Sequence, residues 1–61
     1  MKEKNMDKKQ RILIVDDAKF NRDILKGILG ETYNYLEAED GNQAIRMIEE
    51  SPGIDLMLLD I

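Results

Sequence analysis

The stretch ILIVDD, residues 12–17, decides how this chain is expected to fold. Its four apolar residues form the continuous β-branched and leucine run of a strand covered on both faces, as strands of parallel sheets are. A second run, IDLMLLD at residues 54–60, has the same character and also ends in a carboxylate. Open α/β sheets place their chemistry outside the carboxyl ends of such strands. We therefore expect a functional site where Asp16, Asp17 and Asp60 emerge.

Two helical segments are predicted between these strands. Residues 18–29 carry an apolar stripe at the i, i+4, i+8 spacing of an amphipathic helix, formed by Phe20, Ile24, Leu25, Ile28 and Leu29. Four charged residues are predicted on its solvent face, namely Lys19, Arg22, Asp23 and Lys26. Gly30 is the expected stop. A second, short helix is predicted over residues 42–50, capped at Asp40-Gly41 and ended by residues 51–53, Ser-Pro-Gly.

Thr32–Ala38 alternates Tyr33, Tyr35 and Leu36 with polar residues, which predicts a half-exposed edge strand. The element order is therefore β-α-β-α-β with short connections, and it indicates an α/β domain with a parallel sheet. Right-handed crossovers, together with the need to place the two acid-tipped strands side by side, put the first strand in the middle. The predicted sheet is three-stranded, parallel and of order 2-1-3, with one helix on each face.

Size and composition narrow the function classes. A chain of 61 residues makes one small domain, which buries only about 60% of the surface of its unfolded form. The absence of cysteine and histidine excludes disulfides and zinc clusters, so any metal must be oxygen-bound. No run approaches the roughly 20 apolar residues of a membrane span, and the polar start lacks a signal-peptide core, so we expect a cytoplasmic protein that does not enter a membrane.

Charge is distributed unevenly. Residues 1–11 carry five Lys/Arg against two acids, which leaves −7 for residues 12–61 of a net charge of −4. We interpret residues 1–10 as a flexible basic leader. The acidic body argues against binding of nucleic acid by the domain itself.

Three carboxylates at one sheet edge would repel one another unless a cation or a proton lay among them. This favours a magnesium-dependent phosphoryl acceptor. Asp17 as a simple helix N-cap is the alternative, but capping needs only one acid, and the adjacent Asp16 favours a metal role. The alternative for Asp60 is a solvated acid at a strand end.

Four motifs in this order resemble the receiver domain of two-component response regulators: residues 12–17, Asn21-Arg22, residues 37–44 (EAEDGNQA) and residues 55–60 (DLMLLD). We expect Asn21 and Arg22 themselves to be surface positions on the first helix. The resemblance covers residues 11–61 and matches only the amino-terminal half of the family. It implies a truncated flavodoxin-like unit.

The resemblance also implies a role in signalling rather than enzymatic activity. Asp60 would be the phosphoacceptor, served by a sensor histidine kinase or a phosphotransfer protein. Mg²⁺ would be held by Asp17 and Asp60 directly and by Asp16 through water. The family's further metal ligand, its hydroxyl residue and its lysine counter-charge belong to the other half of the domain. We therefore expect weak Mg²⁺ binding at an incomplete site and impaired phosphotransfer.

Other function classes fit less well or remain open. A haloacid dehalogenase-type phosphatase needs acids two positions apart, and Ala18 occupies the second position. A nucleotide-binding half-domain needs a glycine-rich first turn, which is missing after residue 15. A self-associating structural or engineered half-domain without signalling activity shares every motif and stays open.

The third strand is expected to mediate self-association. Residues 56–59 would form an edge without the charge, proline or bulge that protects natural sheet edges. We expect a homodimer or higher oligomer, either through antiparallel pairing of third strands or through helices of one chain packing on the bare sheet of another.

Overall fold

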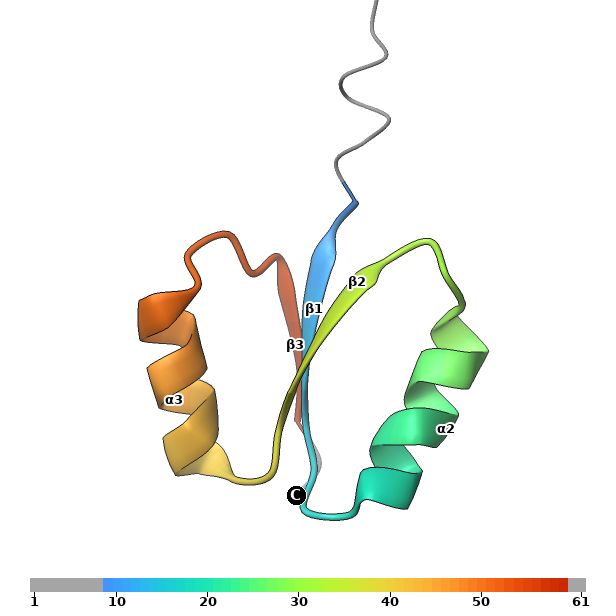
Figure 1. Cartoon of the computed structure of the whole chain (residues 1–61), viewed down its shortest axis with the longest axis horizontal. Coiled ribbons are helices and arrows are strands. Elements are labelled where there is room, and N and C mark those ends of the chain that lie inside the picture. Colours follow the sequence, from blue (N-terminus) through green and yellow to red (C-terminus); the bar gives the residue numbers. More distant parts are fainter. Residues whose placement is uncertain (1–8, 60–61) are drawn as a thin grey trace, which may run out of the picture.

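The computed structural model describes residues 9–59. Their elements are β1 (Arg11–Val15), α2 (Lys19–Leu29), β2 (Asn34–Ala38), α3 (Gly41–Glu50) and β3 (Leu56–Leu59). The strands are parallel and lie in the order β2-β1-β3, with α2 on one face of the sheet and α3 on the other (Figure 1). The predicted α/β class and the strand order 2-1-3 are confirmed. Residues 1–8 of the predicted leader and Asp60 lie outside the described residues.

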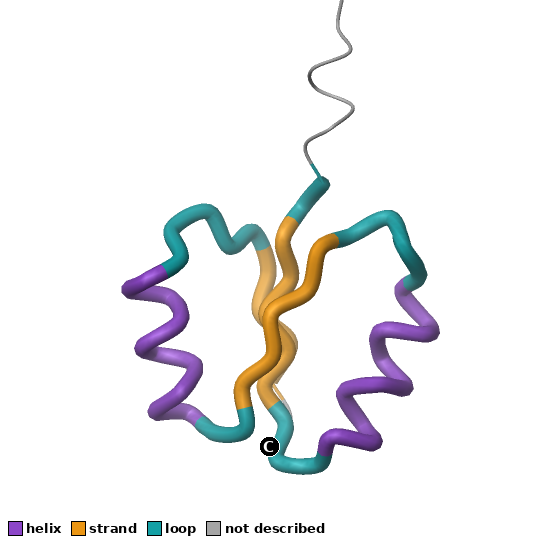
Figure 2. Tube along the Cα trace, viewed as in Figure 1, coloured by secondary structure: helices purple, strands orange, loops and turns teal. Residues whose placement is uncertain are grey.

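The strands end together. Val15, the last residue of β1, pairs with Ala38 of β2 and with Leu59 of β3. In Figure 2 the loops that follow β1 and β2 lead from this edge directly into α2 and α3. Since the strands are parallel, one edge of the sheet collects their carboxyl ends and the helix N-termini. This is the edge at which α/β sheets place ligands.

β1 supplies the centre of the core. Its residues 12–15 are all buried, and Leu13 and Ile14 are completely so. Side chains alternate between faces along a strand, so Leu13 and Val15 lie on the α3 side, where Ala38 and Ala44 pack with them. Leu36, Met47 and Ile54 complete that cluster. Ile12 and Ile14 are covered on the α2 side, which explains why β1 is apolar throughout.

The predicted end of the first helix at Gly30 and the predicted cap of the second helix at Asp40 are both confirmed. At the end of α2, Gly30 has φ +87°, a conformation that strains residues with a Cβ, and its N–H donates to the Lys26 carbonyl at 2.9 Å. At the start of α3, the Asp40 carboxylate accepts from the Gln43 N–H at 2.9 Å. The Gln43 side-chain oxygen accepts from the Glu39 N–H, also at 2.9 Å, in a variant of the capping box.

The outer two strands are shorter than predicted. β2 begins at Asn34 rather than at Thr32, and β3 begins at Leu56 rather than at Ile54. Asp55, just before β3, makes two hydrogen bonds to Arg11 of β1. Its N–H donates to the Arg11 carbonyl, and its carboxylate accepts from the Arg11 N–H, both at 2.9 Å. Because the Arg11 N–H is bonded to a side chain, it makes no backbone hydrogen bond to β3 at this point, and the regular strand begins one residue later.

The prediction for the faces of α2 is wrong in two respects. Arg22, expected to face water, is only 7% exposed. Conversely, Phe20 is 74% and Ile28 73% exposed, and Ile24 is exposed as well. The helix is turned so that the arginine reaches hydrogen-bond acceptors on the sheet. Of the predicted apolar stripe, only Leu25 and Leu29 are half-buried.

Among the described strands, β3 forms an edge of the sheet, as predicted. Within the described residues it pairs with β1, and no strand lies along its other side. Leu56, Met57 and Leu59 are exposed large apolar side chains. Among residues 9–59, no helix combines the length and the apolar character that crossing a bilayer requires.

Candidate functional site

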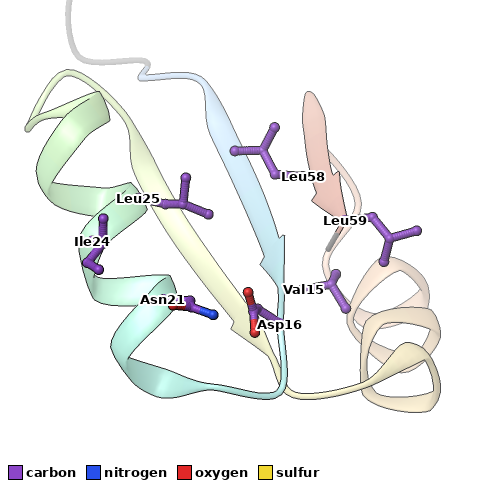
Figure 3. Close-up of a pocket in the computed structure, with 7 residues that line it drawn as sticks. All are labelled: Val15, Asp16, Asn21, Ile24, Leu25, Leu58 and Leu59. Atoms are coloured by element: carbon purple, nitrogen blue, oxygen red, sulfur yellow. The ribbon is translucent and has the colours of Figure 1, made fainter. Parts of the chain in front are cut away.

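Asp16 and Asp17 follow β1 directly but differ in burial. Asp16 is 5% exposed, whereas Asp17 is exposed. Alternation from Ile12 and Ile14 places Asp16 on the α2 side of the sheet. There it lies at one end of a hollow of about 420 Å³ between α2 and β3, lined by Val15, Asp16, Asn21, Ile24, Leu25, Leu58 and Leu59. The Asn21 side chain points toward Asp16, and Leu58 points into the space between β3 and α2 (Figure 3).

Three hydrogen bonds hold Asp16 in place. Its N–H donates to the Ala38 carbonyl at 3.0 Å, and its carboxylate oxygen Oδ1 accepts from the Ala18 N–H at 2.9 Å. Its carbonyl oxygen accepts from Arg22 Nη1 at 2.5 Å. The Oδ1 contact is an Asx-type turn, which folds the loop between β1 and α2 back on itself.

Asp17 does not cap α2. The N-cap residue is Ala18, and it makes no side-chain cap hydrogen bond. The alternative interpretation of Asp17 as an N-cap is therefore wrong. Its exposed carboxylate stands immediately after the buried one.

Arg22 was not expected at the site. Its Nε donates to Glu37 Oε1 of β2 at 2.8 Å, while Nη1 holds the Asp16 carbonyl. Lys26 Nζ approaches the second Glu37 oxygen at 2.6 Å and Asp23 at 3.4 Å, and Lys19 pairs with Asp23 at 2.8 Å. Hydrogen bonds from Lys26 and then from Arg22 lower the pKa of Glu37, so this carboxylate stays ionised.

Only part of the predicted metal site lies among the described residues. No group of three or more possible ligands from Asp, Glu, His and Cys occurs within residues 9–59. Asp60 falls outside that range, although Val15 and Leu59, the residues just before Asp16 and Asp60, are aligned in register. The two acids present suit Mg²⁺ in kind, since it prefers carboxylate oxygens and keeps several waters. One of them is buried beside a hollow and the other is open to solvent.

The lining of the hollow has one further chemical property. Asp16 and Asn21 are its polar residues, and none of the residues that line it is a lysine or an arginine. Arg22 and Lys26 are engaged by Glu37. Within the described part of the chain, no cation therefore faces the hollow.

Comparison with known proteins agrees with this architecture. The family model for the response regulator receiver domain matches residues 12–61. The transcriptional regulatory protein CpxR of Klebsiella pneumoniae is 42% identical over 52 residues, which span 84% of this chain and 22% of CpxR. CpxR of Escherichia coli K12 gives the same identity and coverage. The chemotaxis protein CheY of Halobacterium salinarum is 40% identical over 53 residues, 85% of this chain and 43% of CheY.

The chain thus spans less than half the length of these curated relatives. No solved structure matches it. The family model nevertheless covers most of the chain, including β1 from Ile12 and the acids that follow it. The strand order β2-β1-β3 and the flanking helices agree with the fold expected of that family. The chain therefore belongs to the response regulator receiver domain family.

Proposed function

We propose that this chain acts in two-component signal transduction as the part of a receiver domain that carries the phosphoacceptor Asp60 and the Mg²⁺-binding acids Asp16 and Asp17. The observation that carries the proposal is the register of β1 and β3. Val15 and Leu59, each followed in the sequence by an acid, are direct neighbours at the edge where α/β sheets place ligands.

The proposed reaction is transfer of a phosphoryl group from a phosphohistidine to Asp60. A carboxylate oxygen of Asp60 attacks phosphorus, the phosphorus–nitrogen bond breaks, and the histidine keeps the bonding electrons and leaves as imidazole. The product is an acyl phosphate. Mg²⁺ bound at the acids would neutralise the phosphoryl oxygens and align the attack. Asp16, which is buried and hydrogen-bonded, would supply a fixed carboxylate for that ion, and Asp17 an exposed one.

The 61-residue chain by itself is proposed to transfer phosphoryl groups poorly. Phosphoryl transfer relies on cations that offset charge in the transition state. The hollow beside Asp16 has no lysine or arginine among the described residues that line it. Mg²⁺ binding is proposed to be weak for a related reason, because only two candidate ligands lie within residues 9–59.

The proposed partners are a sensor histidine kinase or a phosphotransfer protein, and the proposed location is the cytoplasm, where such phosphodonors are made. Receiver domains are signalling modules, and we propose that this chain has no enzymatic activity on other substrates. No binding of nucleic acid by residues 12–61 is proposed, since they carry a charge of −7 within a chain of net charge −4.

Phosphorylation tests the acceptor directly. With a small phosphodonor and Mg²⁺, intact-mass spectrometry is expected to show a weak, short-lived adduct of one phosphoryl group on the chain. Asp60→Asn should abolish it, because an amide cannot form the acyl phosphate, whereas Asp55→Asn should retain it. Labelling that persists in Asp60→Asn would contradict the assignment, and stoichiometric long-lived labelling would show that the chain needs no further cation.

Metal binding is tested by thermal melting. If 10 mM Mg²⁺ is tenfold above the dissociation constant, linkage predicts about 1.4 kcal/mol of stabilisation. For a domain of this size that corresponds to a rise in Tm of roughly 6–11 °C. Asp17→Asn should lose most of this rise, while Glu49→Gln, an exposed acid on α3, should keep it. An equal rise in the unaltered chain and in Asp17→Asn would rule out Asp17 as a ligand.

Self-association through β3 is the second candidate function, and the unpaired edge of β3 favours it. We propose a second copy of this chain as the occupant. Leu56–Leu59 contains no charged side chain, so pairing of these four residues with the same segment of a second copy puts no charge inside the paired stretch. Antiparallel pairing would satisfy the backbone groups of both edges and cover the exposed Met57 and Leu59.

A further inference from the structure

Arg22 connects three elements of the fold. It projects from α2, its Nε donates to Glu37 of β2 at 2.8 Å, and its Nη1 donates to the carbonyl of Asp16, the residue just after β1, at 2.5 Å. The residue is 7% exposed. No buried side-chain nitrogen or oxygen among the described residues lacks a hydrogen-bond partner, so this burial is fully compensated.

The contact with Asp16 is made to the main chain. The Asp16 N–H is already bonded to Ala38, and its Oδ1 to the Ala18 N–H. With its carbonyl bonded to Arg22, the residue is fixed on both sides of its Cα and at its carboxylate. The position of Asp17 follows from the direction in which the Asp16 carbonyl points, because the two residues share that peptide plane.

An arginine suits this arrangement better than a lysine does. The guanidinium is planar and presents separate N–H groups in a rigid fork, so it can hold a carboxylate and a carbonyl at the same time. Glu37 fixes one side of the fork at Nε, which aims Nη1 at the Asp16 carbonyl.

We infer that Arg22 is a positioning residue for the acidic pair: it fixes the Asp16 backbone so that the Asp16 and Asp17 carboxylates are held ready for a divalent cation. This inference rests on the proposed function as far as the cation is concerned. The ordering of the loop between β1 and α2 is a separate consequence that requires no metal.

Lys26 provides a matched control within the same network. It lies one turn further along α2 and binds the other oxygen of Glu37 at 2.6 Å, whereas the Asp16 carbonyl is bonded by Arg22. Lys26→Met removes an ion pair to Glu37 without touching the Asp16 carbonyl. Arg22→Met removes an ion pair to Glu37 and the Asp16 contact together. The difference between the two variants reports on the positioning of Asp16.

The experiment measures two quantities on the 61-residue chain. Mn²⁺ affinity is determined by electron paramagnetic resonance titration, and hydrogen exchange of the Ala18 amide, which binds Asp16 Oδ1, is followed by NMR without metal. Arg22→Met is expected to weaken Mn²⁺ binding at least about tenfold, as loss of a group that orients a ligand does. It should also accelerate Ala18 exchange, whereas Lys26→Met should leave both close to those of the unaltered chain. Arg22→Lys should behave like Arg22→Met. If Arg22→Met does not fold, the Mn²⁺ affinity and the Ala18 exchange rate of Arg22→Lys test the inference in its place.

The outcomes separate the two proposals. Failure of the unaltered chain to bind Mn²⁺ would reject the metal site, while faster Ala18 exchange in the Arg22 variants would still support Arg22 as the residue that orders the loop. Equal losses in Lys26→Met and Arg22→Met would overturn the inference, because the effect would then come from the loss of ion pairing with Glu37. Unchanged affinity and exchange in the Arg22 variants would overturn it as well.

Discussion

Size exclusion with light scattering at micromolar concentration is expected to give at least twice the mass of one chain. The physical reason is the edge of β3, along which no described strand pairs. The Asp55 N–H donates to Arg11 of β1, so by alternation the N–H groups of Leu56 and Leu58 point to the free edge. Such unpaired groups, next to exposed apolar side chains, are a template for another strand.

Leu58→Lys is expected to convert this assembly into monomer or to unfold it, since the charge would enter the half-buried apolar hollow between β3 and α2, next to the pairing edge. Ile45→Lys is the matched control, because Ile45 is an exposed isoleucine on α3 away from the β3 edge, and this variant should keep the larger mass. Leu58→Pro separates loss of pairing from loss of folding. It removes the outward N–H and is tolerated at free strand edges.

A folded monomer for the unaltered chain, shown by circular dichroism at the same concentration, would contradict pairing through β3. So would a stable dimer in Leu58→Pro with an unchanged dissociation constant. In that case the interface would lie elsewhere, for example along the exposed stripe of Phe20, Ile24 and Ile28 on α2.

Leu13→Ala is expected to remove most of the stability of the fold. Leu13 is completely buried at the centre of the core, between β2 and β3. Leu-to-Ala changes at such positions cost roughly 3–5 kcal/mol. Domains have about 0.05–0.15 kcal/mol of stability per residue, so a chain of 61 residues has on the order of 3–9 kcal/mol in total. A large fraction of Leu13→Ala molecules should therefore be unfolded at 25 °C.

Urea denaturation followed by circular dichroism measures this loss. Ile28→Ala is the control for the removal of a large apolar side chain, because Ile28 is 73% exposed, and its change should stay within about 0.5 kcal/mol. Similar destabilisation by both variants would show that Ile28 is as deeply buried in solution as Leu13, which would contradict the exposure of α2 described above.

Much of the fold could be predicted because it depends on local patterns. The apolar run at residues 12–15, the helical period after it and the turn residues at Gly30 and Asp40 each act over a few neighbouring positions, and the structure confirms them. The strand order was predicted from the right-handedness of crossovers and from the expectation that the two strands followed by carboxylates are neighbours, and the structure has this order. The position of Asp16 and Asp17 after β1 was likewise readable from the sequence, whereas their role as metal ligands and that of Asp60 as acceptor stay predictions.

What the tertiary structure alone decided is the environment of the charged residues. Helical periodicity placed Arg22 in water, but its burial depends on Glu37, fifteen positions away on another strand, and on the Asp16 carbonyl. Likewise, Asp16 and Asp17 are chemically identical in sequence, and only the alternation of β1 against α2 buries one and exposes the other. A charge is buried where partners from several elements meet to compensate its desolvation, and that meeting exists only in the folded chain.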